Sequence, residues 1–184
     1  MNRRKIWVSL DLKTIYLSIA LLVVTRFQPL KAQVAFGDKC IGLWEGTMYL
    51  YGKGQLRDSV LVQLSVQKTA SPNTWSWKTS YLSKTQPMVK DYKLVLKDAT
   101  TNTYVTDEGD GIVLKDYLFN NKLYNVFETQ GIFLTSSYEL IGDQLIFEVS
   151  SGKKLEEENN AVTNYSVTSL QRVVFKKSTS QPNQ

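Results

Sequence analysis

Alternation of apolar and polar residues with a period of two runs through most of the chain from Ile41 to Lys176. In residues 58–68, for example, valine and leucine occupy one set of alternate positions, and mainly glutamine and serine occupy the other. This pattern is typical of a half-buried β-strand, because successive side chains of a strand point to opposite faces of the sheet. Turns rich in Gly, Asn, Asp and Ser separate the segments, and no stretch has the periodicity of a long helix. We therefore expect an all-β domain.

About ten strands follow from this pattern. They cover residues 41–51, 58–68, 74–81, 92–96, 103–106, 112–119, 122–129, 131–140, 144–150 and 165–176. Most connectors have the length of a hairpin turn, whereas parallel pairing would require crossovers of a dozen or more residues. A row of sequential hairpins leaves two open edges, which closure into a barrel removes. The sequence therefore predicts an up-and-down antiparallel β-barrel.

The N-terminal segment has the organisation of a secretory signal peptide. Three basic residues at positions 3–5 precede an apolar run at 15–24, and Ala32 provides a small residue for cleavage. An uncleaved anchor is the weaker interpretation, because a membrane-spanning helix needs about 20 apolar residues. We expect export to the periplasm or the medium, with no membrane span in the mature protein. The expected division is a signal peptide at 1–32, a barrel domain at 33–177 and a disordered tail at 178–184.

The positive charge of the chain is concentrated in the expected signal peptide. Residues 1–32 hold six of the 22 Lys and Arg and one of the 17 Asp and Glu, so that 16 of each sign remain. A neutral domain gives no reason to expect the basic face that nucleic-acid binding requires. Nucleic acid is therefore not an expected partner.

The chain has no histidine and a single cysteine, Cys40. The absence of histidine excludes Ser-His-Asp and Cys-His nucleophiles and most zinc sites. Cys40 cannot form a disulfide within the chain, so it is a buried core residue, an inert exposed thiol or an intermolecular link, of which we favour the first. We expect no metal, no cofactor and no catalytic residue.

The segment Gly42-Leu43-Trp44-Glu45-Gly46 resembles the G-x-W-x-G opening of calycin barrels, namely the lipocalins, fatty-acid-binding proteins and nitrobindin-like proteins. The resemblance implies that Gly42 and Trp44 help to close one barrel end, with Arg172 of the last strand lying across the Trp44 ring. Haem held through histidine, as in nitrobindin-like proteins, is excluded here, although ligation by tyrosine stays open. The whole pattern is also similar to that of uncharacterised exported lipocalin-like proteins of Bacteroidota.

Aromatic residues recur on many of the expected strands. A ten-stranded barrel is wide enough to enclose a cavity, and Trp and Tyr combine an apolar body with a polar group suited to lining one. We therefore predict that the barrel interior binds a small, largely apolar or aromatic ligand. The predicted lining residues are Trp75, Trp77, Tyr81, Tyr92, Tyr104, Phe127, Tyr138 and Phe147.

Two other functions remain open from the sequence. One is a protein-interaction or envelope-assembly module with a solidly packed barrel, in which outward residues such as Tyr49 and Tyr51 would matter. The other is a hydrolase or isomerase that uses carboxylates inside the barrel, with Asp116 and Glu128 as the first candidates. We interpret the acidic segment at 107–111 as a solvated turn rather than a calcium loop. The oligomeric state is not predicted.

Overall fold

The computed structural model describes residues 34–156 and 161–178. The expected signal peptide at 1–32 lies outside the described residues, as does nearly all of the expected tail at 178–184. No helix in the described part of the chain combines the length and the hydropathy needed to cross a bilayer.

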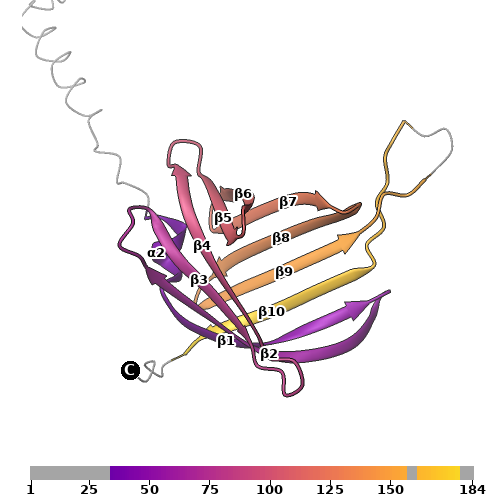
Figure 1. Ribbon diagram of the computed structural model, residues 1–184, viewed down its shortest axis with the longest axis horizontal. Coiled ribbons are helices and arrows are strands. Elements are labelled where there is room, and N and C mark those ends of the chain that lie inside the picture. The colour runs from indigo at the N-terminus through magenta and orange to yellow at the C-terminus, as the bar shows by residue number, and fades with distance from the viewer. Residues whose placement is uncertain (1–33, 157–160, 179–184) are drawn as a thin grey trace, which may run out of the picture. The chain divides into compact units, whose positions relative to one another are not determined.

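The described chain forms one short helix followed by strands that pair in antiparallel fashion into a closed barrel (Figure 1). Each strand pairs with its neighbours in sequence, and the last strand pairs with the first, which confirms the predicted up-and-down barrel. The elements are α2 (Phe36–Cys40), β1 (Gly42–Gly52), β2 (Gln55–Lys68), β3 (Thr74–Tyr81), β4 (Met88–Asp98), β5 (Thr103–Gly109), β6 (Ile112–Phe119), β7 (Lys122–Thr129), β8 (Ile132–Ile141), β9 (Gln144–Gly152) and β10 (Ser169–Lys177).

The last strand begins later than its apolar residues indicate. Tyr165 forms only an isolated bridge with Lys154, and β10 begins at Ser169. Tyr165 also packs its ring against Phe133, with the ring centroids 4.5 Å apart. The long connection after β9 therefore folds back on itself before the final strand begins.

Two-residue turns explain why consecutive strands reverse so tightly. At Asp110-Gly111 and Gln130-Gly131 both central residues have positive φ, between 50° and 81°. This is the requirement of the hairpin turns whose twist matches that of the flanking strands. The acidic segment at 107–111 therefore forms the end of β5 and a hairpin turn. Within the described residues, no group of three or more acidic, histidine or cysteine side chains is placed to hold a metal ion.

The short helix α2 closes one end of the barrel, a feature that the sequence did not predict. The backbone N–H of Phe36 donates a hydrogen bond to the Tyr104 hydroxyl at 3.0 Å, and Trp75 Nε1 donates to Asp38 Oδ1 at 2.9 Å. Gly37 lies against the Trp75 ring so closely that a Cβ there would overlap it. The helix is therefore packed into the barrel end.

Trp44 packs beneath α2 and joins the helix to the barrel. Its side chain is 2% exposed, and its Nε1 donates a hydrogen bond to the Cys40 carbonyl oxygen at 2.7 Å. The Lys177 ammonium lies 5.4 Å from the centre of the Trp44 ring, within the range of a cation–π interaction. Trp44 is therefore part of the packing at the barrel end that α2 occupies.

The basic residue over Trp44 is Lys177, so the expectation for Arg172 was wrong. In the register between β1 and β10, Trp44 pairs with Lys177, and Arg172 pairs with Tyr49. Arg172 lies on the outer face, because its neighbour Val173 points into the core. There it forms an ion pair with Glu148 at 3.3 Å.

Each glycine of the G-x-W-x-G segment is needed for a different structural reason. Gly42 has φ +138°, a conformation that other residues rarely adopt. A Cβ on Gly46 would lie 2.6 Å from the Val174 carbonyl oxygen, so glycine allows β10 to pack closely against β1.

The Cys40 thiol is fully buried, in agreement with the favoured interpretation. Burial raises the pKa of this thiol to about 12, although Lys177 and Lys39 act to lower it. We expect no reaction with 5,5′-dithiobis(2-nitrobenzoate) in the folded protein and one equivalent of released thiolate in guanidinium chloride, because the thiolate is the reactive form. Rapid release from the folded protein would contradict this burial.

Candidate functional site

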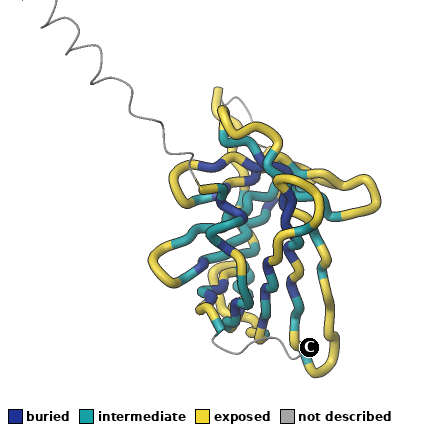
Figure 2. The backbone as a smooth tube through the Cα atoms, turned by 90° about the vertical axis from the view of Figure 1, so that its left-hand side faces the viewer, coloured by how far each residue is buried: buried dark blue, intermediate teal, exposed yellow. Residues whose placement is uncertain are grey.

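Beyond the packed end, the barrel interior holds a cavity with a volume of about 230 Å³. Figure 2 shows the strands as mixtures of buried, half-buried and exposed positions, with exposed turns at their ends. Side chains from β3 to β10 contribute to the cavity wall. Six of the predicted ligand-binding residues line it: Trp77, Tyr81, Tyr92, Phe127, Tyr138 and Phe147.

Three of these aromatic side chains form a continuous wall. The rings of Trp77 and Tyr138 meet edge to face with their centroids 5.1 Å apart, and Tyr138 stacks on Phe147 at 4.3 Å. Burial raises the pKa of the Tyr138 hydroxyl, which therefore stays protonated at neutral pH. Such a wall offers both apolar area and ring faces to an occupant.

Trp75 and Tyr104 do not line this cavity, so their assignment to the ligand site was wrong. Both point into the barrel, as the alternation predicted, but they lie at the end that α2 fills. Trp75 donates its hydrogen bond to Asp38, and the Tyr104 hydroxyl accepts one from the backbone N–H of Phe36. They hold the helix in place at that end of the barrel.

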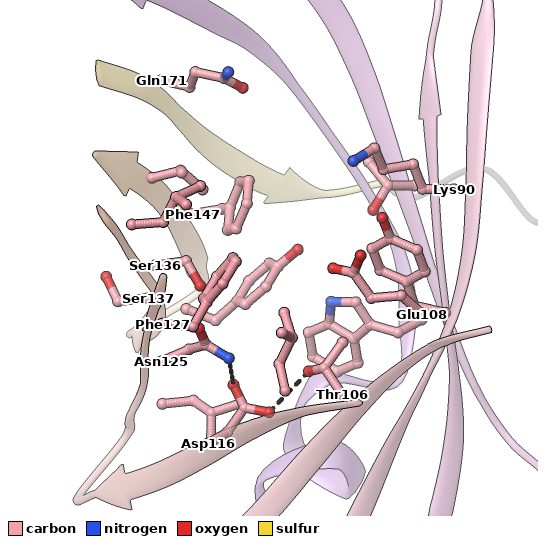
Figure 3. A pocket seen from close by; sticks show the side chains of 18 of the residues that line it. Lys90, Thr106, Glu108, Asp116, Asn125, Phe127, Ser136, Ser137, Phe147 and Gln171 are labelled. Atoms are coloured by element: carbon pink, nitrogen blue, oxygen red, sulfur yellow. Dashed lines mark hydrogen bonds between the residues drawn. The ribbon is translucent and has the colours of Figure 1, made fainter. Parts of the chain in front are cut away.

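Asp116 is the buried acid of the cavity, and it has a defined hydrogen-bonding environment. It is 4% exposed, accepts a bond from Thr106 Oγ1 at Oδ2 (2.9 Å), and accepts one from Asn125 Nδ2 at Oδ1 (3.1 Å) (Figure 3). Burial raises the pKa of the Asp116 carboxyl to about 6, because desolvation outweighs the two hydrogen bonds, and Glu108 adds to the rise. The carboxyl group is therefore ionised at neutral pH and protonated in mild acid.

The two carboxylates proposed for a hydrolase do not meet. Asp116 points into the barrel, but Glu128 is exposed on the outside of β7, because its neighbour Phe127 points inward. A different carboxylate, Glu108 of β5, lines the cavity with Asp116. Of the two candidates for a carboxylate enzyme, only Asp116 therefore points inward.

Two buried polar atoms in the cavity wall have no hydrogen-bond partner within the protein. They are Nε1 of Trp77 and Oδ1 of Asn125, and no other buried side-chain nitrogen or oxygen of the described residues is in this state. The Tyr138 hydroxyl lies close enough to Trp77 to affect the Tyr138 pKa, but the geometry does not make a hydrogen bond. Native proteins rarely leave such atoms unpaired, so each suggests a partner supplied from the cavity.

Lys90 lies near the start of β4, at the side of the cavity away from Asp116 (Figure 3). Burial acts to lower the pKa of its ammonium group, but the nearby Tyr92, Tyr81 and Glu108 raise it above the ordinary value. The Lys90 ammonium also lies 5.6 Å from the centre of the Tyr92 ring. Lys90 is therefore charged at neutral pH, and Glu108 is among the groups that favour that charge.

The sequence analysis missed the polar side chains of the cavity because it selected aromatic residues only. The missed residues occupy the same alternate positions as the aromatic residues that were chosen. They include Thr79, Lys90, Thr106, Glu108, Asn125, Ser136 and Gln171. Thr79 lies between Trp77 and Tyr81 on one face of β3, and Asn125 shares a face of β7 with Phe127. The period-two pattern puts Thr79 and Asn125 on the same faces as the chosen aromatic residues. Lys90 and Glu108 lie outside the expected strands at 92–96 and 103–106, so the pattern could not place them.

Strand pairing ends beside the cavity between β6 and β7. The paired residues run only from Asp116 with Asn125 to Phe119 with Lys122. Residues 112–115 of β6 and 126–129 of β7 have no pairing with one another, yet Leu114 and Phe127 from these parts line the cavity. Each of these parts is held by its other neighbour, because residues 112–115 pair with β5 and residues 126–129 pair with β8.

Comparison with known proteins identifies the fold without identifying a family. No family model and no curated protein matches the sequence. Among solved structures, the S-type phycobiliprotein lyase CPES from Guillardia theta has a TM-score of 0.57 at 10% identity, covering 85% of this chain and 99% of that chain. A protein of unknown function from the DUF3598 family of Nostoc punctiforme has a TM-score of 0.55 at 13% identity, covering 77% of this chain and 49% of that chain. At these identities the likeness concerns the fold alone. It agrees with the predicted β-barrel and gives no support to the similarity to Bacteroidota proteins.

Proposed function

We propose that this barrel is a container that binds one small, largely apolar organic ligand in the cavity beyond α2. The observation that carries the proposal is an aromatic-walled cavity of about 230 Å³ that also presents an unpartnered donor, Trp77 Nε1, and an unpartnered acceptor, Asn125 Oδ1. Apolar walls with a few converging polar groups are characteristic of small-molecule sites. The cavity is smaller than the roughly 300–1,000 Å³ of common ligand pockets, which favours a small occupant.

The fold comparison supports this proposal in a general way. One structural neighbour is a phycobiliprotein lyase, and a likeness to its fold is consistent with a small ligand inside the barrel. The alternative of a solidly packed barrel that binds a protein partner is less well supported, because the interior contains a cavity. Export to the periplasm or the medium remains part of the proposal. N-terminal sequencing of the protein from its own host tests it, and we expect the mature chain to begin near Gln33.

Native mass spectrometry of the protein purified from its host tests whether the barrel contains a ligand. We expect a mass above that of the bare chain, which denaturation reduces to the bare chain with release of the ligand. Ser136→Phe should abolish the additional mass, because Ser136 lines the cavity and the larger side chain fills it. The control is Val126→Phe, which makes a similar enlargement on the exposed face of β7 and should retain the ligand. Bare chain mass, together with an unchanged melting temperature in a panel of small aromatic compounds, would contradict the proposal.

A further inference from the structure

The positive and negative charges of the side chains that line the cavity are unequal in number. Among the residues that the structure describes, those lining the cavity include three charged side chains, Lys90, Glu108 and Asp116. Lys90 and Glu108 have opposite signs and are near enough to influence one another. Asp116 has no cation among the groups that act on its pKa: hydrogen bonds from Thr106 and Asn125 stabilise the carboxylate, and Glu108 opposes its charge. The cavity therefore carries one uncompensated negative charge at neutral pH, at the position of Asp116.

The acceptor atoms at and beside the Asp116 carboxylate lack hydrogen-bond donors, in addition to a compensating positive charge. Each of its carboxylate oxygens accepts one side-chain hydrogen bond, whereas an ionised carboxylate has roughly four lone-pair sites. Next to it, Asn125 is 3% exposed and its Oδ1 has no partner. Figure 3 shows the amide of Asn125 between Asp116 and the side chains of Phe127 and Ser136, with its nitrogen turned to the carboxylate. This end of the cavity can accept more hydrogen bonds than the protein supplies.

Aromatic rings form part of the wall of the same cavity. Trp77, Tyr138 and Phe147 are joined in one wall, and Phe127 lines the cavity near Asn125. The face of an aromatic ring attracts a cation, and the attraction is larger where water is excluded. Buried rings beside an unpaired carboxylate are complementary to a nitrogen cation attached to an apolar body.

We infer that the ligand is a protonated amine whose nitrogen binds Asp116 and Asn125 and whose apolar body lies among the rings of Trp77, Tyr138 and Phe147. This inference rests on the proposed container function and specifies its ligand class. An ammonium group supplies the missing positive charge, and its N–H donors reach both the carboxylate and the free amide oxygen. A carboxylate ligand of the same shape would place a second negative charge beside Asp116. A neutral ligand without N–H or O–H would leave Asn125 Oδ1 unpaired.

Three matched probes separate these cases: 2-phenylethylamine, 2-phenylethanol and 3-phenylpropionate. They share the phenyl ring and differ in the charge of the terminal group. By isothermal titration at about pH 8, we expect the amine to bind at least about tenfold more tightly than the alcohol, and the acid to bind most weakly. Asp116→Asn should reduce the affinity for the amine by about tenfold or more and change that for the alcohol by less than about threefold. Glu128→Gln removes an exposed carboxylate from the adjacent strand and is the control, which should leave all three affinities unchanged.

The preference for the amine should also depend on pH. Other titratable groups face this part of the interior from β3, β4, β5 and β8. They are Tyr81, Lys90, Tyr92, Tyr104, Glu108 and Tyr138. The pKa values of Tyr81, Lys90, Tyr104 and Tyr138 are raised above ordinary values that already lie near 10, so these groups keep their protons between about pH 5 and pH 8. Asp116 gains its proton over this range, so the advantage of the amine over the alcohol should shrink at about pH 5.

The outcomes distinguish the inference from the function on which it rests. If the alcohol or the acid binds as tightly as the amine, and Ser136→Phe abolishes that binding, the cavity is a container but the inference is wrong. An amine preference that survives Asp116→Asn would also overturn it. If none of the three probes binds, and the protein from its host carries no ligand, the container function itself fails.

Discussion

Replacing Trp44 with alanine should lower the free energy of unfolding by about 3–5 kcal/mol, the range for removal of a large aromatic side chain from a core. Trp44 is among the largest fully buried side chains of the described chain. The substitution also removes the hydrogen bond to the Cys40 carbonyl oxygen and the ring beneath Lys177. Because this hydrogen bond joins the end of α2 to β1, the loss should loosen the closed barrel end as well.

Urea unfolding followed by far-ultraviolet circular dichroism measures this effect, with the free energy obtained by linear extrapolation. Tyr49→Ala is the matched control, because it removes an aromatic side chain from the exposed face of the same strand. A surface substitution of this kind usually changes stability by less than about 0.5 kcal/mol. Equal losses for the two variants would contradict the structural role of Trp44.

Asp116→Asn should stabilise the empty protein at about pH 8 by as much as about 3 kcal/mol, the equivalent of raising a carboxyl pKa from 3.8 to about 6. Because the folded-state pKa lies above the unfolded value, the protonated carboxyl favours folding. This contribution is complete below about pH 4 and is lost as the pH rises through about 6. An asparagine is neutral throughout, so its advantage should appear above about pH 6 and vanish near pH 4. The free Oδ1 of Asn125 allows its amide to rotate and accept a hydrogen bond from the new amide.

The measurement is urea unfolding of both proteins at about pH 8 and about pH 4, in the absence of ligand. Glu128→Gln is again the control, because this carboxylate is exposed and its removal should leave stability unchanged at both pH values. A destabilising effect of Asp116→Asn at pH 8 would mean that the buried carboxylate supports the fold. A stabilising effect, combined with weaker binding of the amine, would identify Asp116 as a residue retained for binding at a cost in stability.

Strand alternation predicted the barrel well because it depends only on which residues share a face. Six of the eight aromatic residues predicted to line the interior meet at one cavity: Trp77, Tyr81, Tyr92, Phe127, Tyr138 and Phe147. Alternation contains no information about depth along the barrel axis. Trp75 and Tyr104 were therefore assigned to the ligand site although they contact α2.

Two further errors have the same origin in tertiary structure. The short helix α2 is too brief to show a helical pattern in the sequence, and its place in the barrel end depends on the fit of Gly37 against Trp75. Arg172 was predicted to lie over Trp44, where the structure has Lys177. This error concerns the register of β10 against β1, which cannot be read from either strand alone. Predicting the cavity therefore required strand order, register and the helix together.

Closure of this barrel has a consequence for how fast the chain folds. The pairing of Tyr49 with Arg172 joins the first described strand to the last, which are the most distant pair of strands along the chain. All other pairings are between consecutive strands and bring together residues that are close in sequence. The entropy of the large loop opposes the β1–β10 contact until the intervening hairpins have formed. We therefore expect the hairpins to form first, and the joining of β10 to β1 to set the folding rate, on a timescale of milliseconds to seconds. During synthesis, the barrel cannot close until β10 has left the ribosome, so the cavity is among the last parts of the molecule to form.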